Sequence, residues 1–201
     1  MSASVAIENI PALSAIGKHT RYISWAEFKT RYLNRDDGYK YEWVNGTIEK
    51  TKRAMDQNQY FILKNLRNLF EKLRFQGIIK GGFEAEIDTF FLEAVHRRPD
   101  ISYFSDAQEK GMAHGEKQVP KFVVEIISDN DQMNRVHKKM QNYRDADVQV
   151  VWHIFPQLQE VHVYNGQNLE QMLVCKGENL VSASPILNEF SMSVNDIFSK
   201  N

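Results

Sequence analysis

Residues 122–128 read Phe-Val-Val-Glu-Ile-Ile-Ser, an apolar run that contains a single carboxylate. Polar residues follow the run and a Pro-Lys pair precedes it, a pattern typical of a short buried strand. Because side chains alternate along a strand, Val123, Glu125 and Ile127 are expected on one face. Burying an ionised carboxylate there costs on the order of several kcal/mol unless it is paired, hydrogen-bonded or bound to metal. The run therefore predicts a buried strand whose Glu125 has a specific partner.

Composition limits the class of protein. The chain has 201 residues, 42% of them hydrophobic, which is enough for one domain with a core. We expect this single domain over residues 21–201, preceded by an irregular segment over residues 1–20. A formal net charge of -1 provides no global attraction to nucleic acid, so any such contact must come from a local patch. The lone Cys175 excludes an intramolecular disulfide and a cysteine-rich zinc site. With neither a signal-peptide pattern nor a long apolar run, we expect a cytoplasmic protein without membrane contact.

The first half of the chain predicts a helix, a hairpin, a second helix and further strands. Ser24 begins a capping-box pattern for a helix that ends near residue 34, and Asp56 is placed to cap a helix over residues 57–76. Asn45-Gly46 predicts a hairpin between strands 39–44 and 47–53. Strands are then expected within residues 78–91 and from about residue 100, followed by a polar loop over residues 105–118.

The second half adds a helix over residues 131–146 after the Glu125 strand. A central strand is expected over residues 148–155, a late hairpin from strands 160–164 and 169–176, and a closing helical turn over residues 193–198. This order predicts an α/β (α+β) fold with a single mixed sheet at its centre, flanked by helices. The strands that carry Asp100 and Glu125 should be neighbours in that sheet.

Several short sequence motifs, in their order along the chain, resemble those of one known family. They are Tyr-Glu-Trp-Val-Asn-Gly at 41–46, Pro-Asp-Ile at 99–101, the run at 122–128, Lys139 with Tyr143, Val-Gln-Val-Val-Trp at 148–152 and Val-His-Val-Tyr at 161–164. Together they resemble the Uma2 family, within the PD-(D/E)xK nuclease superfamily, over most of the chain. The resemblance implies a restriction-endonuclease-like core and a metal-dependent endonuclease that hydrolyses phosphodiester bonds of DNA.

The resemblance also implies a site. Asp100 and Glu125 would hold a divalent cation, Mg²⁺ or Mn²⁺, because hard cations prefer carboxylate oxygens. In the superfamily a catalytic lysine lies two residues after the glutamate, where this chain has Ile127, and the family places it instead at Lys139. Glu42 matches a recurrent family carboxylate and is expected as a third ligand or as an acceptor for metal-bound water. Five of the six histidines, at positions 96, 114, 137, 153 and 162, have no ligand spacing.

Helical geometry discriminates between the two adjacent lysines. At about 100° per residue, the apolar face of the 131–146 helix contains Met133, Val136, Met140 and Tyr143. Lys139 lies at the margin of that face, whereas Lys138 points away from it. One turn before the lysine, many relatives have an aspartate where this chain has Arg135.

Each candidate has a simpler structural interpretation. Asp100 follows a proline and suits a turn or the start of a strand, and Glu125 suits a buried salt bridge. Lys139 suits a solvated helix position, and Glu42 suits a cross-strand pair with Lys50 or Lys52.

Two functional hypotheses follow. The first is an endonuclease that acts on DNA, for which the resemblance implies a homodimer able to cut both strands. The second is a catalytically weak or inactive module that binds DNA or protein, favoured by Ile127 and Arg135. Among the basic residues, Arg97 and Arg98 stand just before Asp100 and are candidates for phosphate contacts.

Overall fold

The centre of the protein is a mixed sheet that contains the Glu125 strand. The computed structural model describes residues 21–52, 56–129 and 131–201, so the irregular segment expected over residues 1–20 lies outside the described residues. The strand order of this six-stranded sheet is β10–β9–β8–β7–β6–β3, and only β7 and β8 run parallel. Its members are β3 (Gly82–Ala85), β6 (Ile101–Phe104), β7 (Phe122–Ile126), β8 (Val150–Phe155), β9 (Glu160–Asn165) and β10 (Gln171–Lys176). The predicted mixed sheet and the pairing of the strands at Asp100 and Glu125 are confirmed.

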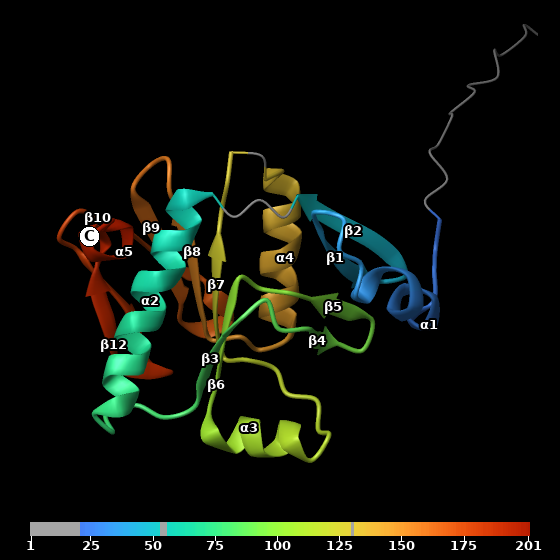
Figure 1. Ribbon diagram of the computed structural model, residues 1–201, viewed down its shortest axis with the longest axis horizontal. Coiled ribbons are helices and arrows are strands. Elements are labelled where there is room, and N and C mark those ends of the chain that lie inside the picture. Colours follow the sequence, from blue (N-terminus) through green and yellow to red (C-terminus); the bar gives the residue numbers. More distant parts are fainter. Residues whose placement is uncertain (1–20, 53–55, 130) are drawn as a thin grey trace, which may run out of the picture.

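Two long helices pack on opposite faces of this sheet, on either side of β7 in Figure 1. Helix α2 (Gln57–Phe75) is capped by Asp56, as predicted, and packs Leu66 and Phe70 against Phe122 and its face of β7. Helix α4 (Met133–Asp145) packs Met140 and Tyr143 against Val123 on the other face. The alternation predicted along β7 is therefore observed. Met133, expected in the apolar face of α4, is instead 52% exposed because it lies in the first turn, beyond the sheet.

A second sheet lies beside α4, at the right of Figure 1, so the expectation of a single sheet was wrong. The β1–β2 hairpin pairs with β5 and does not join the strands around β7. Its order is β2–β1–β5–β4, with β1 (Tyr39–Val44), β2 (Thr47–Lys52), β4 (Thr89–Leu92) and β5 (Val95–Arg97). The predicted hairpin is β1–β2, and its turn residues Asn45 and Gly46 have φ of 47° and 79°, which suits an Asn-Gly hairpin turn. Helix α1 (Trp25–Phe28), capped by Ser24, continues into a π-helical turn, η1 (Lys29–Leu33), close to the predicted end of this segment.

Four elements differ from the sequence expectations. The expected polar loop over residues 105–118 contains helix α3 (Asp106–Ala113), which begins with a complete Ser105–Gln108 capping box. Strand β5 was not expected, because it has only three residues and includes the charged Arg97. Strands β11 (Leu180–Ala183) and β12 (Leu187–Ser193) form a further hairpin. The late β9–β10 hairpin and the closing helix α5 (Val194–Phe198) are as predicted, and a 3-10 turn, η2 (Gln167–Leu169), lies within that hairpin.

Membrane contact was not expected from the sequence. In residues 21–52, 56–129 and 131–201, no helix combines the length and the hydropathy needed to cross a bilayer.

One buried guanidinium joins the second sheet to α4. Arg97 on β5 is 1% exposed, and its Nη1 donates to Glu42 Oε2 at 3.0 Å and Glu49 Oε2 at 2.6 Å. Its Nε and Nη2 donate to Asn142 Oδ1 on α4 at 3.1 and 2.7 Å. The planar fork of arginine suits such multiple contacts. Arg97 thus fixes β1, β2 and α4 relative to one another.

We expect Arg97→Met to lower the free energy of unfolding by about 3–5 kcal/mol, because it removes the cation shared by buried Glu42 and half-buried Glu49. Arg74→Met is the matched control. Arg74 pairs with Glu71 on the exposed side of α2, and such surface pairs are worth about 1 kcal/mol or less. Urea unfolding of the wild type and both variants measures the difference. Equal effects of the two substitutions would show that Arg97 does not hold the second sheet to α4.

Candidate active site

Asp100 and Glu125 are brought together by adjacent strands. Strand β6 begins directly after Asp100 and pairs antiparallel with β7, with Ile101 opposite Val124. The Asp100 Oδ2 atom accepts a hydrogen bond from the backbone N–H of Ile126 at 2.7 Å, which holds this carboxylate beside Glu125. Glu125 is buried, and the Asp100 side chain is 22% exposed.

Glu125 is buried, with 5% of its surface exposed, and it has two side-chain partners on α4. Its Oε1 lies 2.8 Å from Lys139 Nζ, and the Tyr143 hydroxyl donates to the same oxygen. Burial raises the pKa of Glu125; Lys139 opposes this shift, while Asp100 and Glu42 add to it. Burial and Glu125 also raise the pKa of Tyr143 well above its usual value, so its hydroxyl remains a donor. The specific partners predicted for Glu125 are therefore present.

Lys139 turns inward and Lys138 does not. The Lys139 side chain is 14% exposed and its Nζ lies 2.8 Å from Glu125 and 3.2 Å from Glu42 Oε1. Lys138, the preceding residue on α4, is exposed to solvent. The predicted orientation of this lysine pair is confirmed. Its catalytic role remains a prediction.

Glu42 enters the site from β1 and is 6% exposed. It accepts from Arg97, from the backbone N–H of Arg98 at 2.7 Å and from Lys139. Burial acts to raise its pKa, but Lys139, Arg97 and Lys40 outweigh burial and lower the pKa to about 2. The alternative cross-strand pair with Lys50 or Lys52 is not what holds Glu42, whose strand partner is Glu49.

Lys40 is a site residue that the sequence analysis did not identify. Its Nζ lies 2.6 Å from Asp100 Oδ1, and its side chain is only 11% exposed. Burial acts to lower its pKa, but Asp100, Glu125 and Glu42 together raise it. A signal was present in the sequence, because Lys40 precedes Glu42 by two residues and so shares its face of the strand.

Arg97 and Arg98 are not free for phosphate contacts. Arg97 is the buried clamp described above, and Arg98 Nε lies 3.1 Å from Asp88 and is 16% exposed. The expectation that these two side chains bind phosphate was therefore wrong, because carboxylates on neighbouring strands occupy Arg97, and Asp88, in the loop before β4, pairs with Arg98. From the sequence alone, two adjacent arginines are expected to be exposed to solvent, because their carboxylate partners are not known.

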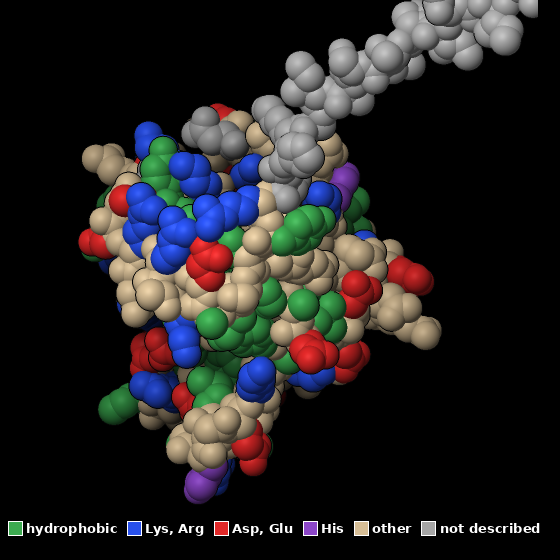
Figure 2. Space-filling view, turned by 90° about the vertical axis from the view of Figure 1, so that its right-hand side faces the viewer, with side chains coloured by type: hydrophobic (Ala, Val, Ile, Leu, Met, Phe, Trp, Pro, Cys, Tyr) green, Lys and Arg blue, Asp and Glu red, His purple; other side chains and the backbone are tan. Residues whose placement is uncertain are grey.

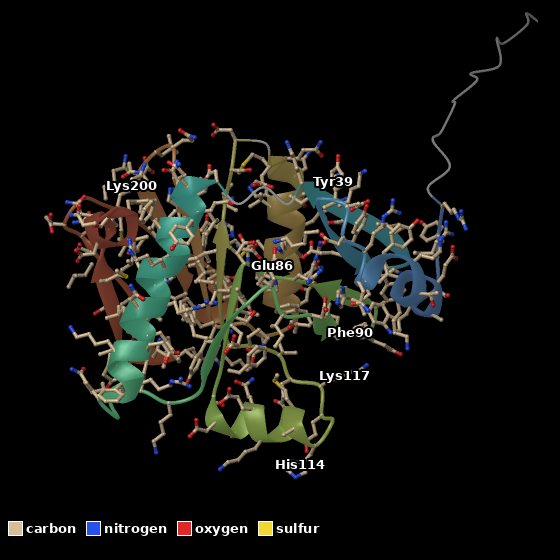
Figure 3. All side chains as sticks on the ribbon, viewed as in Figure 1. Tyr39, Glu86, Phe90, His114, Lys117 and Lys200 are labelled. Atoms are coloured by element: carbon tan, nitrogen blue, oxygen red, sulfur yellow. The ribbon has the colours of Figure 1, made fainter. Side chains whose placement is uncertain are left out.

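A cavity of about 780 Å³ opens over these groups. Its wall includes Lys40, Glu42, Asp100, Glu125 and Lys139, and it extends between the β1–β2 hairpin, the start of α2 and α4. Figure 3 shows Glu86, which also lines the cavity, beside α4 at the centre of the molecule.

His153 on β8 lines the same cavity and stands opposite Glu125 in the parallel register. Burial, with lesser contributions from His162 and Lys139, lowers its pKa to about 3, so this imidazole is neutral near pH 7. The sequence assigned His153 no ligand role because its spacing matches no motif.

Exposed cations surround part of the opening. Lys50 and Lys52 on β2 and Arg135 on α4 line the cavity and are exposed. Arg135 Nη1 donates to the Lys50 carbonyl at 3.0 Å, so the residue that replaces the family aspartate joins α4 to β2. Figure 2 shows Lys and Arg side chains gathered in the upper part of the face that carries the β1–β2 hairpin. We call Lys50, Lys52 and Arg135 the basic rim.

The carboxylates of this site are chemically suited to bind a hard divalent cation. Asp100 and Glu125 offer carboxylate oxygens from adjacent strands, the ligand type that Mg²⁺ and Mn²⁺ prefer. Each carboxylate is already paired with a lysine. In the part of the chain that the structure describes, no group of three or more His, Cys, Asp or Glu side chains is arranged to hold a metal ion. A cation at this site would thus have two carboxylate ligands and would need a shift of the lysines.

Comparison with known proteins assigns the chain to a family. None of the curated proteins matches the chain. A solved structure described as a "putative nuclease belonging to DUF820", from Anabaena variabilis, is similar with a TM-score of 0.71 and 22% identity. The similarity covers 88% of this chain and 97% of that one, and at this identity it establishes a shared fold. The model of the Uma2 family, described as "Putative restriction endonuclease", matches residues 25–195, and the chain belongs to this family.

Proposed function

We propose that this protein is a metal-dependent endonuclease that hydrolyses phosphodiester bonds of DNA. The observation that carries the proposal is the convergence of Asp100, Glu125 and Lys139 in one cavity, with the lysine ammonium 2.8 Å from the glutamate. Adjacent strands supply the carboxylates and the packed helix supplies the lysine. A nuclease of this class needs carboxylates for a cation and a nearby group that acts on water.

Each residue has a distinct role in the proposed reaction. Asp100 and Glu125 would hold Mg²⁺ or Mn²⁺, which when bound neutralises phosphate charge and lowers the pKa of a coordinated water. Lys139 orients the attacking water towards phosphorus. Glu42 fixes the Lys139 ammonium through its 3.2 Å contact. Water attack forms a new P–O bond as the P–O bond to the leaving sugar oxygen breaks, and that oxygen takes up a proton.

The basic rim supplies the local attraction that the net charge of -1 does not. Lys50, Lys52 and Arg135 border the cavity that contains the carboxylates, so a phosphate backbone lying across the rim would bring a phosphodiester to them. Backbone contacts of this type position nucleic acid without reading its sequence.

One observation favours a second function, an inactive module that binds DNA through the same rim. Asp100, Glu42 and Glu125 are each paired with a lysine or an arginine, and Ile127 stands where the superfamily has its lysine. A network of this kind stabilises a fold without catalysis. Metal-dependent cleavage distinguishes the two functions.

Asp100→Asn keeps the shape of the side chain but removes the charge that attracts the cation. We expect Mg²⁺- or Mn²⁺-dependent nicking of supercoiled DNA to fall by about 10²-fold or more, because cation-assisted attack provides several kcal/mol. We also expect a lower melting temperature, because Lys40 at 2.6 Å loses its charged partner. Asp145→Asn, an exposed aspartate on α4, is the matched control. Metal-dependent nicking that is absent from the wild type, or unaffected by Asp100→Asn, contradicts the proposal.

The adjacent lysines on α4 provide an internal comparison. We expect Lys139→Ala to abolish cleavage and Lys138→Ala to preserve most of it, because only Lys139 reaches the carboxylates. Both changes remove one positive charge from the same helix turn, so general attraction to DNA falls equally. Single-turnover cleavage at saturating protein measures the difference. Equal losses would mean that these lysines act only through their charge.

A further inference from the structure

Lys40 occupies a place that the proposed reaction leaves unexplained. The alternation of β1 puts it on the same face as Glu42, and its ammonium lies 2.6 Å from Asp100 Oδ1. The side chains of Lys40 and Asp100 are only 11% and 22% exposed. The pair is therefore far better shielded from water than an ordinary surface ion pair.

Both oxygens of Asp100 are engaged. Oδ2 accepts from the Ile126 backbone N–H, a contact that fixes the carboxylate on β7, and Oδ1 accepts from Lys40. The backbone contact persists as long as β6 and β7 stay paired. The Lys40 contact depends only on a flexible four-carbon side chain that borders the cavity.

Glu125 differs from Asp100 in this respect. Its partners Lys139 and Tyr143 both come from α4, and Lys139 is itself held by Glu42. Among the described ion pairs of the two candidate ligands, the Lys40–Asp100 pair is the one formed by a residue with no assigned role in catalysis or in binding DNA.

We propose that Lys40 is a built-in counter-cation that competes with a divalent metal ion for Asp100 Oδ1, so that metal enters only when the Lys40 ammonium withdraws. The inference rests on the proposed metal site and deepens it. Lys40 is a positioning residue in this account. Without metal it neutralises Asp100 and keeps the carboxylate in place, and it lowers the affinity of the site for metal.

Mn²⁺ binding tests this competition directly. Isothermal titration of the full chain with Mn²⁺ should show at least about tenfold tighter binding for Lys40→Met than for the wild type, because a unit positive charge in contact with the ligand has been removed. Lys40→Gln, which can still donate a hydrogen bond to Asp100, should also bind more tightly and serves if the methionine variant does not fold.

Two controls separate competition from general charge. Lys40→Arg keeps the competing charge and should bind Mn²⁺ within about threefold of the wild type. Lys52→Met removes an exposed cation from the rim of the same cavity, and its effect should be small because water and salt screen exposed charges. Equal tightening by Lys52→Met and Lys40→Met overturns the proposal. Unchanged or weaker binding by the Lys40→Met and Lys40→Gln variants, including no binding by any protein, also overturns it.

The nicking assay reports separately on the proposed function. Wild-type cleavage that depends on Asp100, with no tightening in Lys40→Met, rejects the role of Lys40 and keeps the nuclease. Tighter Mn²⁺ binding by Lys40→Met, with no cleavage by the wild type, keeps the competition and rejects the nuclease.

Discussion

The site depends on the contacts of the Arg97 guanidinium, because this buried cation must be neutralised by protein groups where water cannot reach it. It lies at 1% exposure between β1, β2 and α4, and it contacts Glu42, Glu49 and Asn142. A buried cation of this kind demands carboxylates at fixed positions. Meeting that demand places Glu42 on one side of the cavity and α4, with Lys139, on the other. The second sheet is thus part of the site as well as of the fold.

A second consequence concerns the charges that remain. Burial makes every carboxylate near β7 costly unless a cation is close, and Lys139 and Lys40 provide those cations for Glu125 and Asp100. The same requirement is met when a divalent cation is present, because the cation can replace a lysine as the neutralising charge. The proposed exchange between lysine and metal would account for carboxylates that are paired in the protein alone. It also explains how the proposed nuclease and an inert ion-pair network can share one set of residues.

Local patterns in the sequence predicted much of this arrangement. The apolar run around Glu125, the Asn-Gly turn and the period of α4 are short-range signals, and they predicted β7, the β1–β2 hairpin and the inward turn of Lys139. Family resemblance brought together Asp100, Glu125, Lys139 and Glu42, which spacing alone cannot do. Their roles as catalytic residues and metal ligands remain predictions.

The features that were missed depend on contacts distant in sequence or on weak local patterns. From the sequence alone, Arg97 is expected at the surface. Its partners Glu42 and Glu49 are 55 and 48 residues away in the sequence and are brought beside it only by strand pairing. Lys40 was overlooked although alternation places it with Glu42. Helix α3 has a capping box but no buried residue, so it lacks the apolar period that usually reveals a helix.

Anomalous diffraction from crystals soaked in Mn²⁺ tests most directly whether Asp100 and Glu125 share one cation. We expect one Mn²⁺ peak about 2.0–2.6 Å from oxygens of both carboxylates, with the Lys40 ammonium moved off Asp100. Carboxylates that keep their lysine partners at saturating Mn²⁺, with no peak between them, would contradict it.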